Sequence, residues 1–537
     1  MQLTVKHIEG YAYGAIQTTA VIYVSNVEAD TSSYVSQLAK LKEALPTFED
    51  PMRFSGDPSL FDQSTAPALF VTIIDILNNY CGDQRFTPIN VFKEDSSICF
   101  AMPTLAPLMV NAHLNAIDGF MKKLAKGMKA KELYNAIDSL KKQMRILLPA
   151  GTNAGNFIAA AAKRRIPFKI FNTQLVIFGY GSGSSIFNSS LTDQESMIGV
   201  QLAGSKVTTN RFLKMSGIPV AEQARVRTLE EALNFADKVG YPVVLKPEAE
   251  AQGRGVYSNI INESELRECW ELLQKNAYKA ICIEMHVPGD TYRINTIDDQ
   301  VVRIVKRIPA LVIGNGRSTI AELLDELNNE PLRKDPKNSS MVPLIIDDDV
   351  IRTLAKQSFD VNSVPQEGDT VYLTSISNIS RGGHVIDFYQ EFHPDNFSLC
   401  EKISRIMRLN MTGIDVITVD GSQPWRNGDF VVCEVNSMPQ LGVSHMHIYD
   451  DLVAKKVRIK PYIKLVVSSA SASETSLFDP ICDSIEITAS SGAILRHGCP
   501  VQYFDELEIS DDVSGEDRLK IERMIVSVQP ELVPAIS

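Results

Sequence analysis

A lysine followed by a glycine-rich loop is the feature of this sequence best suited to binding phosphate. Lys246 ends the apolar run 241–245, and Gly253, Arg254 and Gly255 follow it. A lysine at the end of a strand can reach phosphate oxygens, and glycine lets the main chain approach them closely. Gly-x-Gly and Lys-Pro are common, so an ordinary turn explains this loop equally well when it is taken alone.

Three side chains further along carry the oxygen ligands that Mg²⁺ prefers. Glu434 and Asn436 stand two residues apart on an expected strand, so their side chains share one face. Asp415 closes an apolar run on an expected neighbouring strand, and Lys206 stands at an expected helix start. Phosphoryl transfer needs cations and metal ligands that align and neutralise the phosphates. The combination therefore predicts a site for ATP and its magnesium.

The residues expected on the nucleoside side form a weaker signal. Glu284 follows the apolar run 280–283 and is suited to bind the adenine amino group, with the main chain from Met285 to Val287 completing a hinge. Asp290 is suited to hold the ribose hydroxyls. Turn chemistry around the Pro-Gly-Asp sequence that ends at Asp290 is the alternative explanation for these positions.

Composition excludes several classes of function. The 537 residues carry 53 Lys and Arg against 65 Asp and Glu, which gives a net charge of −12 and argues against a nucleic-acid-binding surface. No apolar run has the length of a membrane-spanning helix. The eight cysteines are scattered without a Cys-x-x-Cys pair, which favours reduced thiols in the cytoplasm and disfavours structural zinc.

The patterning predicts a mixed α+β and α/β protein of three parts. An N-terminal α/β accessory domain is expected over 1–163, a ligand-binding domain over 164–455 and a short C-terminal extension over 456–537. The helix expected over 229–239 has a capping sequence before it and Gly240 after it. Strands and helices alternate clearly from about residue 166 onward.

With these residues identified, the chain resembles an ATP-grasp carboxylate–amine ligase. The resemblance is strongest to the ATP-grasp half of cyanophycin synthetases and next to the ligase module of bifunctional glutathione synthetases. It extends from about 165 to about 447. The ordered matches are Gly217-Ile-Pro-Val, Gly240-Tyr-Pro-Val-Val-Leu-Lys-Pro, Gly253-Arg-Gly-Val, Arg307-Ile-Pro-Ala-Leu-Val-Ile-Gly-Asn-Gly, Ser318-Thr-Ile-Ala-Glu-Leu, Asn378-Ile-Ser-Arg-Gly-Gly, His393-Pro-Asp-Asn, Gly413-Ile-Asp-Val and Glu434-Val-Asn.

The resemblance implies an ATP-grasp fold and an amide-forming reaction that passes through an acylphosphate. It implies ATP and Mg²⁺ as cofactors, with Mn²⁺ as the alternative ion, amino-acid or small-peptide substrates, and a homo-oligomer that is a dimer or tetramer. The residue roles carried over are phosphate contacts from Lys206 and Lys246, nucleoside contacts from Glu284, Val287 and Asp290, metal ligation by Asp415, Glu434 and Asn436, catalytic arginines Arg293 and Arg307, and a substrate loop with Asn378, Ser380, Arg381 and Gly382.

The sequence also departs from the family pattern. Glu248 and Glu250 precede Gly253, where the family has a run richer in Gly and His, and two carboxylates would repel a triphosphate unless they point away. Ser205 stands where an acidic residue is common. No Mur-ligase-like module follows, so a single ligation is expected. A catalytically impaired ATP-binding regulator or scaffold and a kinase that stops at the acylphosphate are the alternative functions.

Overall fold

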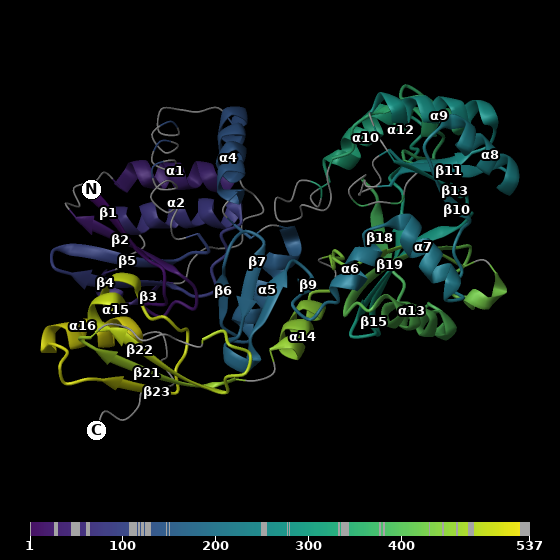
Figure 1. The fold of residues 1–537 in the computed structure, drawn as a ribbon. Helices are drawn as coiled ribbons and strands as arrows, with labels where there is room; N and C mark the ends of the chain where they lie inside the picture. Colours follow the sequence, from purple (N-terminus) through teal and green to yellow (C-terminus); the bar gives the residue numbers. More distant parts are fainter. Residues whose placement is uncertain are drawn as a thin grey trace. The chain divides into compact units, whose positions relative to one another are not determined.

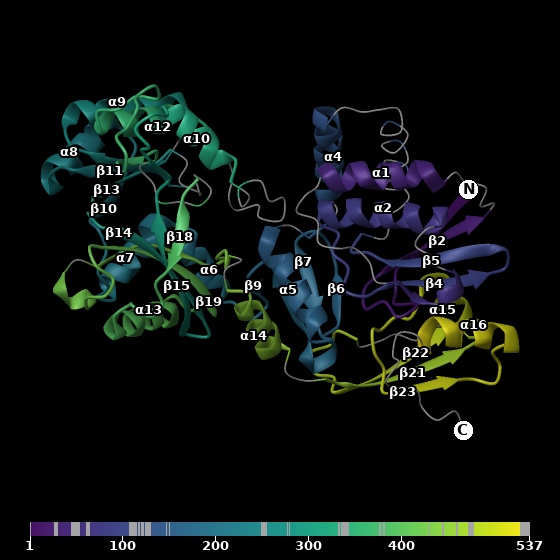
Figure 2. The same ribbon diagram turned by 180° about the vertical axis from the view of Figure 1, so that it is seen from behind.

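The computed structural model divides the chain into two compact units. Unit 1 comprises residues 1–189 and 449–537, and unit 2 comprises 190–448. Both units appear in Figures 1 and 2. The residues described are 2–25, 31–44, 54–60, 65–106, 115, 119, 123, 130–146, 148–149, 151–248, 255–276, 278, 280–330, 333, 343–374, 377, 379, 382–428, 430–442, 445–457, 460–470 and 477–526.

Unit 1 is assembled from segments at both ends of the chain. Its N-terminal elements are β1 (Gln2–Ile8), β2 (Thr19–Ser25), α1 (Thr31–Ala44), β3 (Phe54–Gly56), α2 (Ala66–Cys81), β4 (Ile89–Glu94), β5 (Ser97–Pro103), α4 (Ala130–Arg145), α5 (Gly151–Lys163), β6 (Phe168–Ile170), β7 (Leu175–Phe178) and β8 (Ser185–Asn188). Its C-terminal elements are α14 (His447–Lys456), β21 (Tyr462–Ser468), β22 (Ser484–Ser490), α15 (Ser491–His497), β23 (Glu506–Ile509) and α16 (Gly515–Val526).

Two sheets in unit 1 share one apolar core. The first has the strand order β1-β2-β5-β4-β3, and the second is a parallel sheet of order β22-β21-β23. Along β2, Ile22 packs into a core with α2, whereas Val21 on the opposite face packs into a core with α15, α16 and the parallel sheet. In Figure 1, α1 and α2 lie along one face of the first sheet, and α15 and α16 lie between the two sheets.

Unit 2 contains the segment that carries every predicted site residue. Its elements are β9 (Leu191–Thr192), α6 (Met197–Ala203), α7 (Lys206–Met215), β10 (Gln223–Val226), α8 (Leu229–Val239), β11 (Val243–Pro247), β12 (Tyr257–Ile260), α9 (Glu263–Lys275), β13 (Ile281–Met285), β14 (Asp290–Ile297), β15 (Gln300–Ile308), β16 (Leu311–Ile313), α10 (Ile320–Asn328), α12 (Asp348–Lys356), β17 (Thr370–Tyr372), β18 (His384–Asp387), α13 (Pro394–Met407), β19 (Met411–Thr418) and β20 (Val431–Asn436).

Two sheets of unit 2 each bury one face against helices. The small sheet β10-β13-β11-β12 packs Leu245 and Ile283 against α8 and α9. The larger sheet β18-β15-β14-β19-β20 packs Ile294 and Ile414 against α13 and α7. Because side chains alternate along a strand, the residues between these apolar ones point to the opposite, helix-free faces. Those two faces carry Lys246 and Glu284 on the small sheet, and Arg293, Asp415, Glu434 and Asn436 on the larger sheet.

The helix predicted over 229–239 is confirmed together with its caps. It is α8 (Leu229–Val239), with Thr228 capping its first turn and Gly240 ending it at a φ of 86°. The Glu231 carboxylate accepts from the Arg227 amide, one residue before the cap. All eight cysteines are free thiols. No helix in the described segments is both long and apolar enough to cross a membrane.

The contact-based units and the expected sequence domains are divided differently. Unit 2 begins at Ser190 and ends at Ile448, inside the expected 164–455 domain, and residues 164–189 pack with unit 1. The C-terminal strands share the core of the N-terminal sheet rather than forming a separate body. The domain boundaries at 163/164 and 455/456 stay predictions.

Candidate active site

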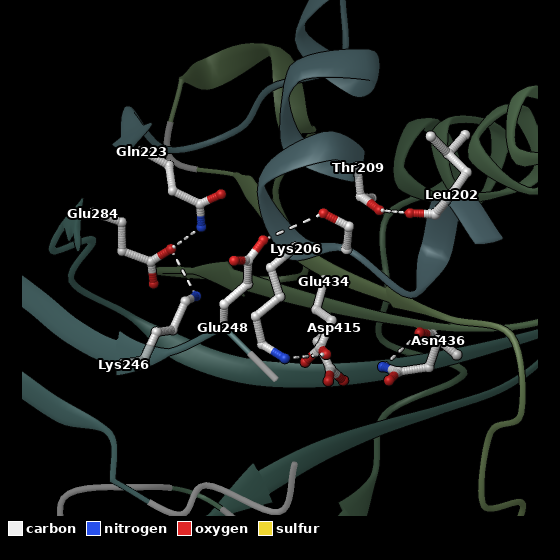
Figure 3. A network of polar contacts seen from close by, with 12 residues as sticks. Leu202, Lys206, Thr209, Gln223, Lys246, Glu248, Glu284, Asp415, Glu434 and Asn436 are labelled. Atoms are coloured by element: carbon white, nitrogen blue, oxygen red, sulfur yellow. Dashed lines mark hydrogen bonds and ion pairs between the residues drawn. The ribbon is translucent and has the colours of Figure 1, made fainter. Parts of the chain in front are cut away.

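The helix-free face of the small sheet carries a row of polar side chains around one carboxylate. Lys246 on β11 donates to Glu284 Oε2 at 2.7 Å, and Gln223 Nε2 donates to the same oxygen at 2.7 Å. Strand register explains the meeting, because Gln223, Glu284 and Val244 are direct neighbours on β10, β13 and β11. Figure 3 shows Lys246 and Gln223 pointing toward Glu284 from opposite sides.

Lys246 stays charged although it is almost completely buried. Burial lowers the pKa of Lys246, but the Glu284 carboxylate raises it, and the net shift is upward. The ammonium is therefore retained at neutral pH. The structure thus places one predicted phosphate ligand beside one predicted adenine ligand.

Lys206 lies on the other side of the site, in the first turn of α7. Ser205 is the N-cap of this helix, and its hydroxyl accepts from the Thr208 amide. Lys206 Nζ lies 3.1 Å from Glu434 Oε1 on β20. In Figure 3 the side chain extends from its helix toward the strands that carry Asp415 and Glu434. Ser205, which stands where the family commonly has an acidic residue, therefore caps this helix through its hydroxyl group.

The three predicted metal ligands lie together on β19 and β20. Asp415 and Glu434 are direct cross-strand partners, and Asn436 stands opposite Gly413. Asn436 Nδ2 donates to the Gly413 carbonyl at 3.2 Å, which leaves its amide oxygen available as a ligand. Glu434 is half-buried. Its carboxylate and the Asn436 amide oxygen are hard oxygen donors of the kind that Mg²⁺ binds.

Asp415 is held by two arginines from neighbouring strands. Arg293 Nε donates to Oδ1 at 2.5 Å and Nη2 to Oδ2 at 2.9 Å, and Arg307 Nη1 lies 3.4 Å from Oδ1. Burial raises the pKa of Asp415, but Arg293 and Arg307 together lower it by more, so the net shift is downward. Burial and the neighbouring Arg293 lower the pKa of Arg307 to about 10. A metal ion at Asp415 would share this carboxylate with a guanidinium.

Gly413 provides the room that Arg293 needs. A Cβ at this position would lie 2.8 Å from Pro439 Cβ and 3.1 Å from Arg293 Nη1. Real Cβ atoms do not approach other carbon atoms this closely. The glycine in the Gly-Ile-Asp sequence therefore has a packing reason, which sequence reasoning did not identify.

An ion pair that was not predicted from the sequence lies at the start of the predicted phosphate loop. Glu248 is the first acidic residue in the loop whose sequence differs from the family pattern. It forms an ion pair with Arg225 on β10, and Ser205 Oγ lies 3.5 Å from its carboxylate. Arg225 stands in the same cross-strand row as Cys282 and Lys246, so it lies on the helix-free face. Glu248 is consequently neutralised by a cation. The only sequence signal was the unusual acidic loop itself.

The remaining predicted residues divide into described and undescribed positions. Asp290 forms an ion pair of 2.5 Å with Lys306 on the adjacent strand. No protein acceptor contacts the Val287 amide within the part of the chain that the structure describes. Gly255 is in a left-handed conformation at a φ of 67°. The Gly382 carbonyl accepts from Arg333 Nη2 at 2.6 Å. Gly253, Arg254, Asn378, Ser380 and Arg381 lie outside the described residues.

Comparisons with known proteins point to the same region. A family model described as an ATP-grasp domain matches residues 201–285. The cyanophycin synthetase of Trichormus variabilis is 34% identical over 293 residues, which are 54% of this chain and 32% of that protein. The glutathione biosynthesis bifunctional protein GshAB of Clostridium perfringens is 28% identical over 302 residues, which are 54% of this chain and 38% of that protein. The chain therefore spans about a third of the length of these relatives.

Among solved structures, a bifunctional glutathione synthetase from Pasteurella multocida aligns with a TM-score of 0.43 and 21% sequence identity, covering 65% of this chain and 51% of that one. The resemblance to ATP-grasp ligases drawn from the sequence is confirmed, and so is the mixed α/β class of the fold. The roles assigned to individual site residues stay predictions.

Proposed function

The chain carries an ATP-grasp domain, and on this premise we propose that it is an ATP-dependent carboxylate–amine ligase. The proposed reaction joins an amino acid or small peptide to an amine and releases ADP and phosphate. The observation that supports it best is the meeting of Lys206, Arg293 and Arg307 at the paired carboxylates Asp415 and Glu434. Cations around metal-binding oxygens suit a transferring phosphoryl group, whose charge must be neutralised.

The proposed reaction has two steps. A carboxylate oxygen of the substrate attacks the γ-phosphorus of ATP, the bond to the bridging β–γ oxygen breaks, and ADP leaves. The amine then attacks the carbonyl carbon of the acylphosphate, the C–O bond to phosphate breaks, and the amine loses a proton. Lys246 and Lys206 would bind the phosphates, and Arg293 and Arg307 would stabilise charge on the transferring group.

The oxygen atoms of Asp415, Glu434 and Asn436 are of the kind that magnesium prefers. Glu434 and Asn436 would hold the ion, and Asp415 would contribute while it is bound by Arg293. Magnesium commonly takes one or two protein carboxylates together with oxygens of substrate phosphates. Bound there, Mg²⁺ or Mn²⁺ would neutralise phosphate charge.

The proposal also includes the class of substrate, the oligomeric state and the compartment. Amino-acid or peptide substrates are consistent with the names of the relatives. A homo-oligomer in the cytoplasm, a dimer or tetramer, is proposed from the family resemblance.

The test is ADP and phosphate release with pairs of amino acids, followed by mass spectrometry of the product. We expect ADP only when an acid, an amine and Mg²⁺ are all present. Lys246→Ala and Glu434→Ala should reduce ADP release by at least about a hundredfold, whereas exposed Lys275→Ala, outside the site, should leave it unchanged. ATP binding without ADP formation would support the regulator instead. ADP formation without an amine would indicate an acylphosphate-forming kinase.

A further inference from the structure

Unit 1 contains a cavity of about 1210 Å³ whose lining includes none of the predicted ATP, metal or substrate residues. Its walls come from the segment after β1, from β6, from β22 and from α15. Tyr11 packs with Ile487 and Ile494 in one apolar core, and its hydroxyl donates to the Phe168 carbonyl of β6, so the walls belong to one packed body. The volume is comparable to that of a site for a large ligand.

One wall is the open edge of β6. This strand is at the end of its sheet and pairs with β7. The Gly179 amide donates to the Pro167 carbonyl, and the Phe171 amide donates to the Leu175 carbonyl. Main-chain groups alternate sides along an antiparallel strand, so residues 167, 169 and 171 face β7 and Ile170 faces away. The Phe168 carbonyl also faces away, where it accepts from the Tyr11 hydroxyl at 2.9 Å.

Another wall is the open edge of β22. The order β22-β21-β23 places this parallel strand at the end of its sheet. The Tyr462 amide on β21 donates to the Asp483 carbonyl, and the register pairs Ile463 with Ile485. By alternation, the main-chain groups at 485, 487 and 489 face β21, and those of Thr488 face away. Thr488 lines the cavity.

The cavity therefore presents main-chain hydrogen-bonding groups that nothing satisfies within the described chain. Neither Ile170 nor Thr488 has a main-chain partner on its outward side there. Such edges pair with another extended main chain, which supplies amide and carbonyl groups at the same spacing. Ile170 and Thr488 each offer an amide donor and a carbonyl acceptor on the outward side, which is the arrangement that an extended peptide main chain complements.

The other lining groups define the kind of peptide. The apolar walls include Phe168, Leu477 and Ile494. The charged lining groups are Lys169 and His497 against Glu9 and Asp479, so no surplus of positive charge favours a phosphate-bearing ligand. We propose that this cavity binds an extended peptide with apolar side chains, whose main chain pairs with the open edges of β6 and β22. The proposal is independent of the ATP site.

The probe is an equimolar set of acetylated, amidated pentapeptides with Lys at both ends and Val, Leu or Phe at each central position. Peptides retained by the full-length protein on gel filtration are identified by mass spectrometry. The tightest one is labelled, and its affinity is measured by fluorescence anisotropy. We expect an analogue N-methylated at its central residues to bind about tenfold or more weakly, because it cannot donate to a strand edge.

Matched proline variants locate the binding edge. Proline removes one amide donor and is tolerated on an edge strand. Thr488→Pro and Ile170→Pro should each weaken binding about tenfold, whereas Glu486→Pro should not. Glu486 also faces outward on β22 but does not line the cavity. A melting temperature for each variant close to that of the unsubstituted protein shows that both fold.

Three outcomes would overturn the proposal: no retained peptide, equal binding of the N-methylated analogue, or equal effects of Thr488→Pro and Glu486→Pro. Self-association of the protein that Thr488→Pro abolishes would instead assign the edge to a second copy of the chain. Because binding is measured without ATP, these results are separate from any failure to release ADP.

Discussion

Asp415 shows how one carboxylate is kept ionised by its position on the sheet. Its direct cross-strand partner on β14 is Arg293, and Arg307 lies on the next strand. Two guanidinium groups compensate for the burial that would otherwise neutralise the acid. The ion pair therefore contributes to folding stability as well as to the proposed chemistry.

This pairing predicts a pH-dependent stability difference between the protein and Asp415→Asn. The pKa of Asp415 is lowered from 3.8 in the fold, so its stabilisation is complete above that value and is lost as the pH falls through the folded-state pKa. Urea unfolding should show the variant less stable at pH 7 by about 3–5 kcal/mol, since it leaves buried arginines unpaired. The difference should shrink below about pH 4. A difference that stays constant down to about pH 2 would contradict this assignment.

We predict that Arg225 positions Glu248 at the start of the predicted phosphate loop. Its ion pair holds the Glu248 carboxylate on the side of β10, and Ser205 also contacts that carboxylate. Without the arginine, the carboxylate would repel a triphosphate bound between Lys206 and Lys246. The repulsion should grow with the number of phosphates on the ligand.

We therefore expect Arg225→Gln to weaken ATP binding by about tenfold and ADP binding by less, and to leave adenosine binding unchanged. Isothermal titration with the three ligands measures this. The double variant Arg225→Gln with Glu248→Gln should recover ATP affinity. Lys214→Gln, which removes a separate exposed ion pair with Glu222, serves as the control. Equal losses for ATP and adenosine would indicate a merely structural role for Arg225.

At the scale of elements, β19 approaches its neighbours closely at one point. Gly413 leaves space for both Pro439 and the Arg293 guanidinium. Gly413→Ala should destabilise the fold by about 1–3 kcal/mol, because the neighbours must shift. It should also lower ADP release more than ATP affinity, because it displaces Arg293. Chemical denaturation and kinetics measure these effects. Gly515→Ala at the start of α16 meets no atom within 4 Å and should be neutral. Equal behaviour of the two variants would refute the packing argument.

Local periodicity predicted elements well because it depends on nearby residues. The helix predicted over 229–239 is present with the same bounds. The pair formed by Arg225 and Glu248 was not predictable, because it depends on β13 separating β10 from β11. Strand order and register are set by tertiary packing, which no local pattern encodes.

Register also explains which site predictions could be made. Glu434 and Asn436 share a face by simple alternation, and the structure places them so. That Asp415 would meet Arg293 required the pairing of β14 with β19, whose residues are 122 apart in the chain. The sequence could therefore propose ligands for the site, but not the partners that hold them.

At the scale of the whole molecule, the two units should respond differently to nucleotide. If MgATP binds to unit 2 as proposed, it should stabilise that unit by mass action. Hydrogen exchange with mass spectrometry should show slower exchange in β11, β13 and β20 on addition of MgATP, and unchanged exchange in β2 and β21. Glu434→Ala should abolish the difference. Protection of β21 equal to that of β20 would show that the two units are coupled.

The joining of both chain ends in unit 1 has a consequence for biosynthesis. Tyr11 and Cys499 exchange main-chain hydrogen bonds of 2.8 and 2.9 Å, and β21 and β22 complete the core that begins with β1 and β2. On the ribosome, residue 499 emerges long after residue 11. The core between β1 and β2 and the C-terminal strands therefore cannot form until β21 and β22 have been synthesised. Unit 2, which is continuous in sequence, can fold in the meantime. Until then, apolar residues of β1 and β2 such as Ile8 and Val21 lack their partners in this core, and we expect chaperones to protect them.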